Sequence, residues 1–102
     1  MAKVKVKFVG LSYLTNNHEE VEIEVKDVQS LIEELALRYK RFKEEVIDKN
    51  TKWISSNFIV LLNNVVIHEN RSFKDGDTLS IIPAISGGFI NASVYPFQPN
   101  LF

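Results

Sequence analysis

The sequence predicts an α+β fold in which a mixed sheet of four to five strands packs on one helix. Short apolar segments with strand periodicity occur in both halves of the chain, and one segment with helical periodicity lies between them. The length of 102 residues is about that of one ordinary domain. One helix cannot cover both faces of a parallel sheet, which excludes a doubly wound fold.

The first two strands are predicted from the alternation of charged and apolar residues over 3–8 and over 20–25. This is the period of a strand with one buried face. A hairpin folded about Tyr13 and Leu14 pairs each lysine of the first strand with a glutamate of the second. It also pairs the apolar residues of the two strands with one another. The expected pairs are Lys7 with Glu20, Lys5 with Glu22, Lys3 with Glu24, Val6 with Val21 and Val4 with Ile23. Because a slip of one residue would spoil both faces, the sequence predicts this single register.

The helix is predicted to begin after Asp27, whose carboxylate can accept from the free amides of the first turn. Its apolar residues recur at helical spacing on one side. They are Val28, Leu31, Ile32, Leu35, Ala36 and Tyr39. We expect Phe42 and Val46 to continue the helix as a last turn, and 48–56 to form a loop.

Three further strands are predicted after this loop. The apolar run 58–62 has strand character, Asn63-Asn64 can supply the positive φ of a tight turn, and 65–67 follows it. A turn at 74–77 leads to a last strand over 79–82, which Pro83 ends. With the first and last strands side by side in parallel, this order gives the β-grasp, or ubiquitin-like, architecture. Eight residues are expected to share its core: Val4, Val6, Ile23, Leu31, Ile32, Leu35, Val60 and Leu79.

Composition excludes several classes of protein. The net charge of −1 offers no basic excess for nucleic acid or an anionic membrane. Without cysteine there is no disulfide, thiolate nucleophile or cysteine-bound metal, and His18 and His68 lack a pattern of companion ligands. No apolar run reaches the roughly 18 residues of a membrane span, and the alternating start does not resemble a signal peptide. We therefore expect a cytoplasmic protein that holds no metal.

The sequence from Phe89 to Phe102 differs from the rest of the chain. All charged residues precede position 78, whereas 89–102 contains four aromatic residues. A solvated chain gains nothing from aromatic surface. We therefore expect this segment to pack on its own domain or on a neighbouring copy, near the last strand, with Phe97 or Phe102 in an apolar groove. The sequence thus divides into a domain over 1–88 and a C-terminal extension over 89–102.

The end of the domain carries a family resemblance. The segment Phe73-Lys-Asp-Gly-Asp-Thr-Leu-Ser-Ile-Ile-Pro-Ala-Ile-Ser-Gly-Gly88 resembles the closing segment of the MoaD/ThiS family of ubiquitin-like sulfur carriers. Within that family it is most similar to the small subunit of molybdopterin synthase. The strand and turn at 61–64 and the helical segment 28–46 resemble the family as well.

The resemblance implies a carrier subunit of a sulfurtransferase complex rather than a catalyst. In the family, an activating enzyme of the ubiquitin-activating type uses ATP to adenylate the diglycine carboxylate, here that of Gly88, which then becomes a thiocarboxylate. The sulfur reaches a pterin precursor inside the large subunit of molybdopterin synthase. The resemblance also implies that Ser86, Gly87 and Gly88 thread into the partner, that Ile82, Pro83 and Ile85 contact it, and that the carrier binds no cofactor.

Fourteen residues follow Gly88 in this sequence, so its carbonyl group is in a peptide bond with Phe89. Sulfur carriage therefore requires removal of 89–102, for instance by a processing protease. Position 84 is alanine where many relatives have a second proline, and 10–17 lacks the family's Arg-Glu pair. Two alternatives remain: a ubiquitin-like modifier made as a precursor and attached through Gly88 to lysines, and an unprocessed β-grasp interaction module.

Overall fold

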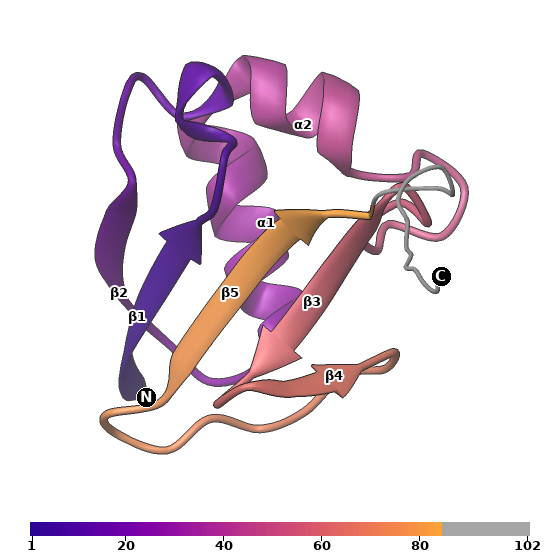
Figure 1. The fold of residues 1–102 in the computed structure, drawn as a ribbon. Helices are drawn as coiled ribbons and strands as arrows, with labels where there is room; N and C mark the ends of the chain where they lie inside the picture. The colour runs from indigo at the N-terminus through magenta and orange to yellow at the C-terminus, as the bar shows by residue number, and fades with distance from the viewer. Residues whose placement is uncertain (85–102) are drawn as a thin grey trace, which may run out of the picture.

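The computed structural model describes residues 1–84, which form one five-stranded sheet with two helices on one face (Figure 1). The strands are β1 (Ala2–Phe8), β2 (Glu20–Val25), β3 (Phe58–Leu62), β4 (Val65–Ile67) and β5 (Thr78–Pro83), and the helices are α1 (Val28–Arg38) and α2 (Lys40–Val46). The strand order is β2-β1-β5-β3-β4, with β1 and β5 parallel and the other neighbours antiparallel. The last strand therefore lies in the centre of the sheet, beside the first, as predicted.

The β1–β2 register is the predicted one at every pair. Lys7 lies opposite Glu20, and Val6 lies opposite Val21. The side chains of β1 alternate strictly between buried and exposed. The Lys5 ammonium lies 3.9 Å from the carboxylate of Glu20, and both side chains are about half exposed, so this ion pair adds little stability. The buried face therefore sets the register, and the charged face agrees with it.

The turn between Lys74 and Asp77 fixes the start of the parallel β1–β5 pairing. The Lys3 N–H donates to Oδ1 of Asp75 at 2.9 Å, and the Gly76 N–H donates to the Lys3 carbonyl at 3.0 Å. The Lys5 N–H then donates to the Asp77 carbonyl at 3.0 Å. Gly76 has φ +89°, a conformation that L-residues rarely adopt. The turn motif thus bonds directly to the strand beside which β5 must lie.

The β3–β4 turn is bonded to the same region. Asn63 and Asn64 have φ of 51° and 70°, which confirms the expected tight turn. The Asn63 side-chain amide donates to Oδ1 of Asp77 at 2.9 Å, and its oxygen accepts from the Thr78 N–H at 2.9 Å. Oδ2 of Asp77 accepts from the Lys74 N–H at 2.8 Å. Asn63 and Asp77 therefore connect the β3–β4 turn to the turn that precedes β5.

The helical region differs from the prediction in having two helices. Asp27 caps α1 as expected, because its Oδ1 accepts from the Ser30 N–H at 2.8 Å. At Tyr39 the backbone becomes extended, with φ −129° and ψ 101°, so α2 is a separate helix instead of the last turn of α1. The rings of Tyr39 and Phe42 both pack edge-on against Phe8, with centroids 6.0 and 5.9 Å away. This packing on β1 favours the break.

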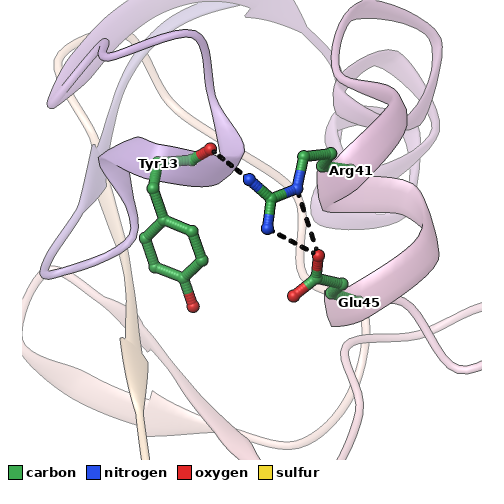
Figure 2. A network of polar contacts seen from close by, with 3 residues as sticks. All are labelled: Tyr13, Arg41 and Glu45. Carbon is green, nitrogen blue, oxygen red and sulfur yellow. Dashed lines mark hydrogen bonds and ion pairs between the residues drawn. The ribbon is translucent and has the colours of Figure 1, made fainter.

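Arg41 connects α2 to the loop after β1 (Figure 2). Its guanidinium group donates to the Glu45 carboxylate at 3.0 Å and to the Tyr13 carbonyl at 3.4 Å. The guanidinium carbon also lies 5.4 Å from the centroid of the Tyr13 ring. The short 3₁₀ turn at Ser12–Leu14 is thereby held against the second helix.

The core lies between the sheet and the helices. All eight residues expected to share it are buried there, and Leu35 is fully buried. The loop 48–56 also contributes, since Ile54 is buried and forms an isolated bridge with Ile47. Neither helix within residues 1–84 is long and apolar enough to cross a membrane.

Candidate functional site

The central strand β5 carries the chain out of the sheet at the end where the predicted site begins. Ile82 pairs with Ile59 and Pro83 pairs with Phe58, both on β3. The N–H of Ala84, the last described residue, donates to the Asn57 carbonyl at 2.8 Å. The β1 pairing of β5 ends at Ile81, so the chain leaves the sheet along the start of β3.

Two of the six predicted site residues lie in the described part of the chain. Ile82 is half-buried and Pro83 is exposed. The other four, Ile85, Ser86, Gly87 and Gly88, lie outside the described residues. Gly88 is four residues after Ala84, so its distance from the end of the sheet is at most about 14 Å.

The sheet face that points away from the helices carries an apolar patch beside this exit. Phe58 and Leu62 pack against the core, so Ile59 and Leu61 lie on the opposite face of β3. Across the ladders, Ile59 pairs with Ile82 and Leu61 pairs with Val66. We call these four residues the outer patch: Ile59, Leu61, Val66 and Ile82. Val66 is 48% exposed and the other three are half-buried.

The charges on this face are separated from the outer patch. Across β5, Lys5 pairs with Thr78 and Lys7 pairs with Ser80, so polar residues lie between the lysines and the patch. The glutamates opposite the lysines lie farther out, on the edge strand β2. An apolar area with a polar and charged border is typical of a protein–protein contact surface.

The described residues offer an apolar contact surface beside the end of β5. Within residues 1–84 no three His, Asp or Glu side chains lie close enough together to hold a metal ion. His18 and His68 lie in different loops, and Nδ1 of His18 is 3.4 Å from the Tyr39 hydroxyl. The sequence singles out Gly88, which follows β5 by five residues, and the described residues place an apolar surface beside the end of β5.

Comparison with known protein families shows which family the chain belongs to. The family model described as the ThiS family matches residues 6–88. The chain belongs to the ThiS family. The match ends at Gly88, and the 89–102 segment lies beyond it. A search of the curated proteins finds no match.

Solved structures agree with the ThiS family assignment. A putative molybdopterin converting factor, subunit 1, from Pyrococcus furiosus is 30% identical, with a TM-score of 0.67 over 83% of this chain and 100% of that chain. A chain from the BexX/CysO complex of Amycolatopsis orientalis is 26% identical, with a TM-score of 0.69 over 83% and 99%. The small archaeal modifier protein 1 of Methanosarcina acetivorans is 24% identical, with a TM-score of 0.74 over 86% and 98%.

These comparisons confirm the β-grasp, ubiquitin-like fold and the resemblance to the MoaD/ThiS sulfur carriers. They do not test the roles of individual residues. Of the outer patch, the sequence pointed only to Ile82. The signal for the rest was the run 58–62, which is apolar at every position. This strand is apolar on both faces, and only one face packs against the helices. The apolar side chains of its other face must therefore contact a partner or solvent.

Proposed function

We propose that this ThiS-family chain is a sulfur carrier whose Gly88 carboxylate is activated after removal of 89–102. The carboxylate attacks the α-phosphorus of ATP on an activating enzyme of the ubiquitin-activating type. Pyrophosphate leaves and an acyl adenylate forms. Hydrosulfide from a sulfur donor then attacks the acyl carbon, a C–S bond replaces the C–O bond to the phosphate, and AMP leaves. The product is a thiocarboxylate on Gly88.

One structural observation carries this proposal. The family match ends at Gly88, five residues after the end of the central strand β5, which pairs with β1 on one side and β3 on the other. A carrier needs a reactive end that can enter another protein while the domain remains outside. Glycines at 87 and 88 have no side chains to obstruct a narrow channel, and they give the backbone freedom to thread it.

The outer patch supplies the second requirement, a surface for the partner. It includes Ile82, with Pro83 next to it and Ile85 shortly after, so docking there would bring the diglycine towards the partner. The Pyrococcus relative is described as subunit 1 of a converting factor, and the Amycolatopsis relative was solved in a complex. We infer that the large subunit of molybdopterin synthase is the sulfur-accepting partner. We place this ATP-dependent chemistry in the cytoplasm.

The test compares a chain that ends at Gly88 with the full 102-residue chain. Each is incubated with activating enzyme, ATP and a sulfur donor, and intact masses are measured. The shorter chain should form the adenylate and then gain the mass difference between sulfur and oxygen. The full chain should do neither, since its Gly88 has no free carboxylate. Adenylation of the full chain, or no adenylation of the shorter one, would contradict the proposal.

The same experiment separates the carrier from the modifier. An isopeptide bond between Gly88 and a lysine, in place of a thiocarboxylate, would assign the modifier role. Mass spectrometry of the protein isolated from its own cells tests the third alternative, because an unprocessed interaction module would retain 89–102.

A further inference from the structure

A groove of about 610 Å³ lies beside the outer patch, on the side of the sheet edge formed by β4. Its lining residues come from β3 and β4 and from the loop between α2 and β3. Its lining includes Trp53, Ser55, Phe58, Ile59, Val66 and His68. Two of these residues, Ile59 and Val66, also belong to the outer patch, so the groove and the patch are continuous.

The groove lies where the sheet is incomplete. Strand β5 pairs with β3 over Phe58–Leu62, whereas β4 pairs with it only over Val60–Leu62. Among residues 1–84, no strand lies beside Phe58 on the β4 side. Backbone groups of alternate residues point to alternate sides of a strand. Phe58 therefore directs its carbonyl to the same side as Val60 and Leu62, into the space left by the short β4.

The chain leaves the sheet next to this space. The bond from the Ala84 N–H to the Asn57 carbonyl, 2.8 Å long, holds the exit one residue from Phe58 in the groove wall. Residues 85–88 can span up to about 14 Å when extended. The segment that starts at Phe89 is therefore within reach of the groove around the start of β3.

The chemistry of 89–102 suits the groove. The segment has no charged residue, so its burial desolvates no charge. Ile90, Ala92 and Val94 alternate with polar or small residues, as in a strand added to a sheet edge. Phe97 and Phe102 follow in the sequence and would supply aromatic side chains for the apolar part of the groove wall.

We propose that residues 89–102 of the same chain occupy this groove, donate a backbone hydrogen bond to the Phe58 carbonyl, and cover Trp53 and part of the outer patch. The segment then competes with any protein that binds Ile59 and Val66. In the uncleaved chain the segment would cover the surface that the partner binds. That chain would also lack a free carboxylate at Gly88. The docking itself does not depend on the chemistry proposed for Gly88.

Trp53 is the only tryptophan in the chain, so its fluorescence reports on the groove. The full chain is compared with a full-length variant that carries Tyr95→Ser, Phe97→Ser and Phe102→Ser. We expect acrylamide to quench Trp53 at least twofold more strongly in the variant. Amide exchange over 89–102 should be slowed at least tenfold in the wild-type chain and unprotected in the variant.

Two substitutions in β4 provide a matched pair. Val66→Glu places a charge in the groove wall, and Val65→Glu places the same charge on the neighbouring residue, which does not line the groove. Both valines are exposed, by 48% and 64%, so both variants should fold. Val66→Glu should raise quenching and exchange to the level of the tail variant, whereas Val65→Glu should leave both unchanged.

A dilution series identifies the occupant. Protection of 89–102 that is independent of concentration supports docking within one chain. Protection that appears only at high concentration would overturn it and assign the groove to a segment from a second copy. Unprotected amides at every concentration, with Trp53 equally quenched in all variants, would also overturn it. If Val66→Glu fails to fold, the tail variant alone decides.

Discussion

At the scale of single residues, the turn at 74–77 shows what each residue of the Lys-Asp-Gly-Asp motif contributes to the fold. Gly76 provides a left-handed conformation, Asp75 accepts a bond from the backbone of Lys3, and Asp77 accepts bonds from Lys74 and Asn63. Each residue type is needed for one of these contacts. Together they bond β1, β3 and β5 at the same end of the sheet.

Gly76→Ala should lower the free energy of unfolding by about 1–2 kcal/mol, because φ +89° is unfavourable for a residue with a Cβ. A Cβ at this position would meet no atom within 4 Å, so the cost comes from the backbone alone. Gly76→Asn should cost less, since asparagine tolerates positive φ better. Urea unfolding of the three proteins measures this. Equal stability of wild type and Gly76→Ala would contradict the stated cause.

Asp77 should make stability depend on acidity. The bond from the Asn63 amide, followed by that from the Lys74 N–H, lowers the pKa of Asp77 below its ordinary value of 3.8. A carboxyl group with a lower pKa in the folded state stabilises the protein above the unfolded pKa. This contribution disappears as the pH falls through the folded pKa.

The free energy of unfolding of the wild type should therefore fall as the pH drops below about 4. The fall should be smaller in Asp77→Asn. Glu24→Gln, which removes the same charge from the exposed face of β2, is the control and should follow the wild type. Parallel pH profiles for wild type and Asp77→Asn would argue against this role.

At the scale of elements, the sequence predicted most where two independent patterns agree. The β1–β2 register follows from Lys–Glu pairs on one face and Val–Ile pairs on the other. The break at Tyr39 could not be predicted, since no Gly or Pro marks it and apolar residues at 35, 39, 42 and 46 keep helical spacing. Packing of Tyr39 and Phe42 on Phe8 is a tertiary contact that helical periodicity does not reveal.

Leu35→Ala in α1 should lower the free energy of unfolding by about 2–5 kcal/mol, because it leaves a cavity at a fully buried position. Leu37 lies on the same helix and is 84% exposed, so Leu37→Ala should change stability by less than about 0.5 kcal/mol. Thermal or urea unfolding compares the two. Similar effects from both substitutions would mean that the buried face of α1 is misassigned.

At the scale of the whole molecule, one face of the sheet holds the helices and the other is open for recognition. The outer patch could be inferred only in part from sequence, because an apolar run such as 58–62 does not reveal which side chains face outwards. The strand pairing shows which side chains face outwards: Ile59 pairs with Ile82, and Leu61 is two residues after Ile59, so all three lie on one face. The predicted diglycine site itself lies outside the described residues and stays a prediction.

Leu61→Ser should weaken binding of the chain ending at Gly88 to its large-subunit partner at least tenfold, since it puts a hydroxyl group in the outer patch. It should lower the free energy of unfolding by less than Leu35→Ala, because Leu61 is half-buried and faces away from the core. Calorimetric titration and urea unfolding give the two values. Lys5→Ala, on the charged side of the same face, is the control. Unchanged affinity of Leu61→Ser would exclude the patch as the contact.

The parallel pairing of β1 with β5 also determines how the domain responds to mechanical force. Tension between the N-terminus and the segment after Ala84 pulls β1 and β5 in opposite directions along their shared ladder, from Lys5–Thr78 to Phe8–Ile81. The hydrogen bonds of that ladder are then loaded in shear, all at once, instead of opening one after another. Single-molecule stretching between the two ends should show one high-force rupture. An unfolding enzyme that pulls on the C-terminal side would therefore meet the strongest resistance at β5, the first strand that it reaches.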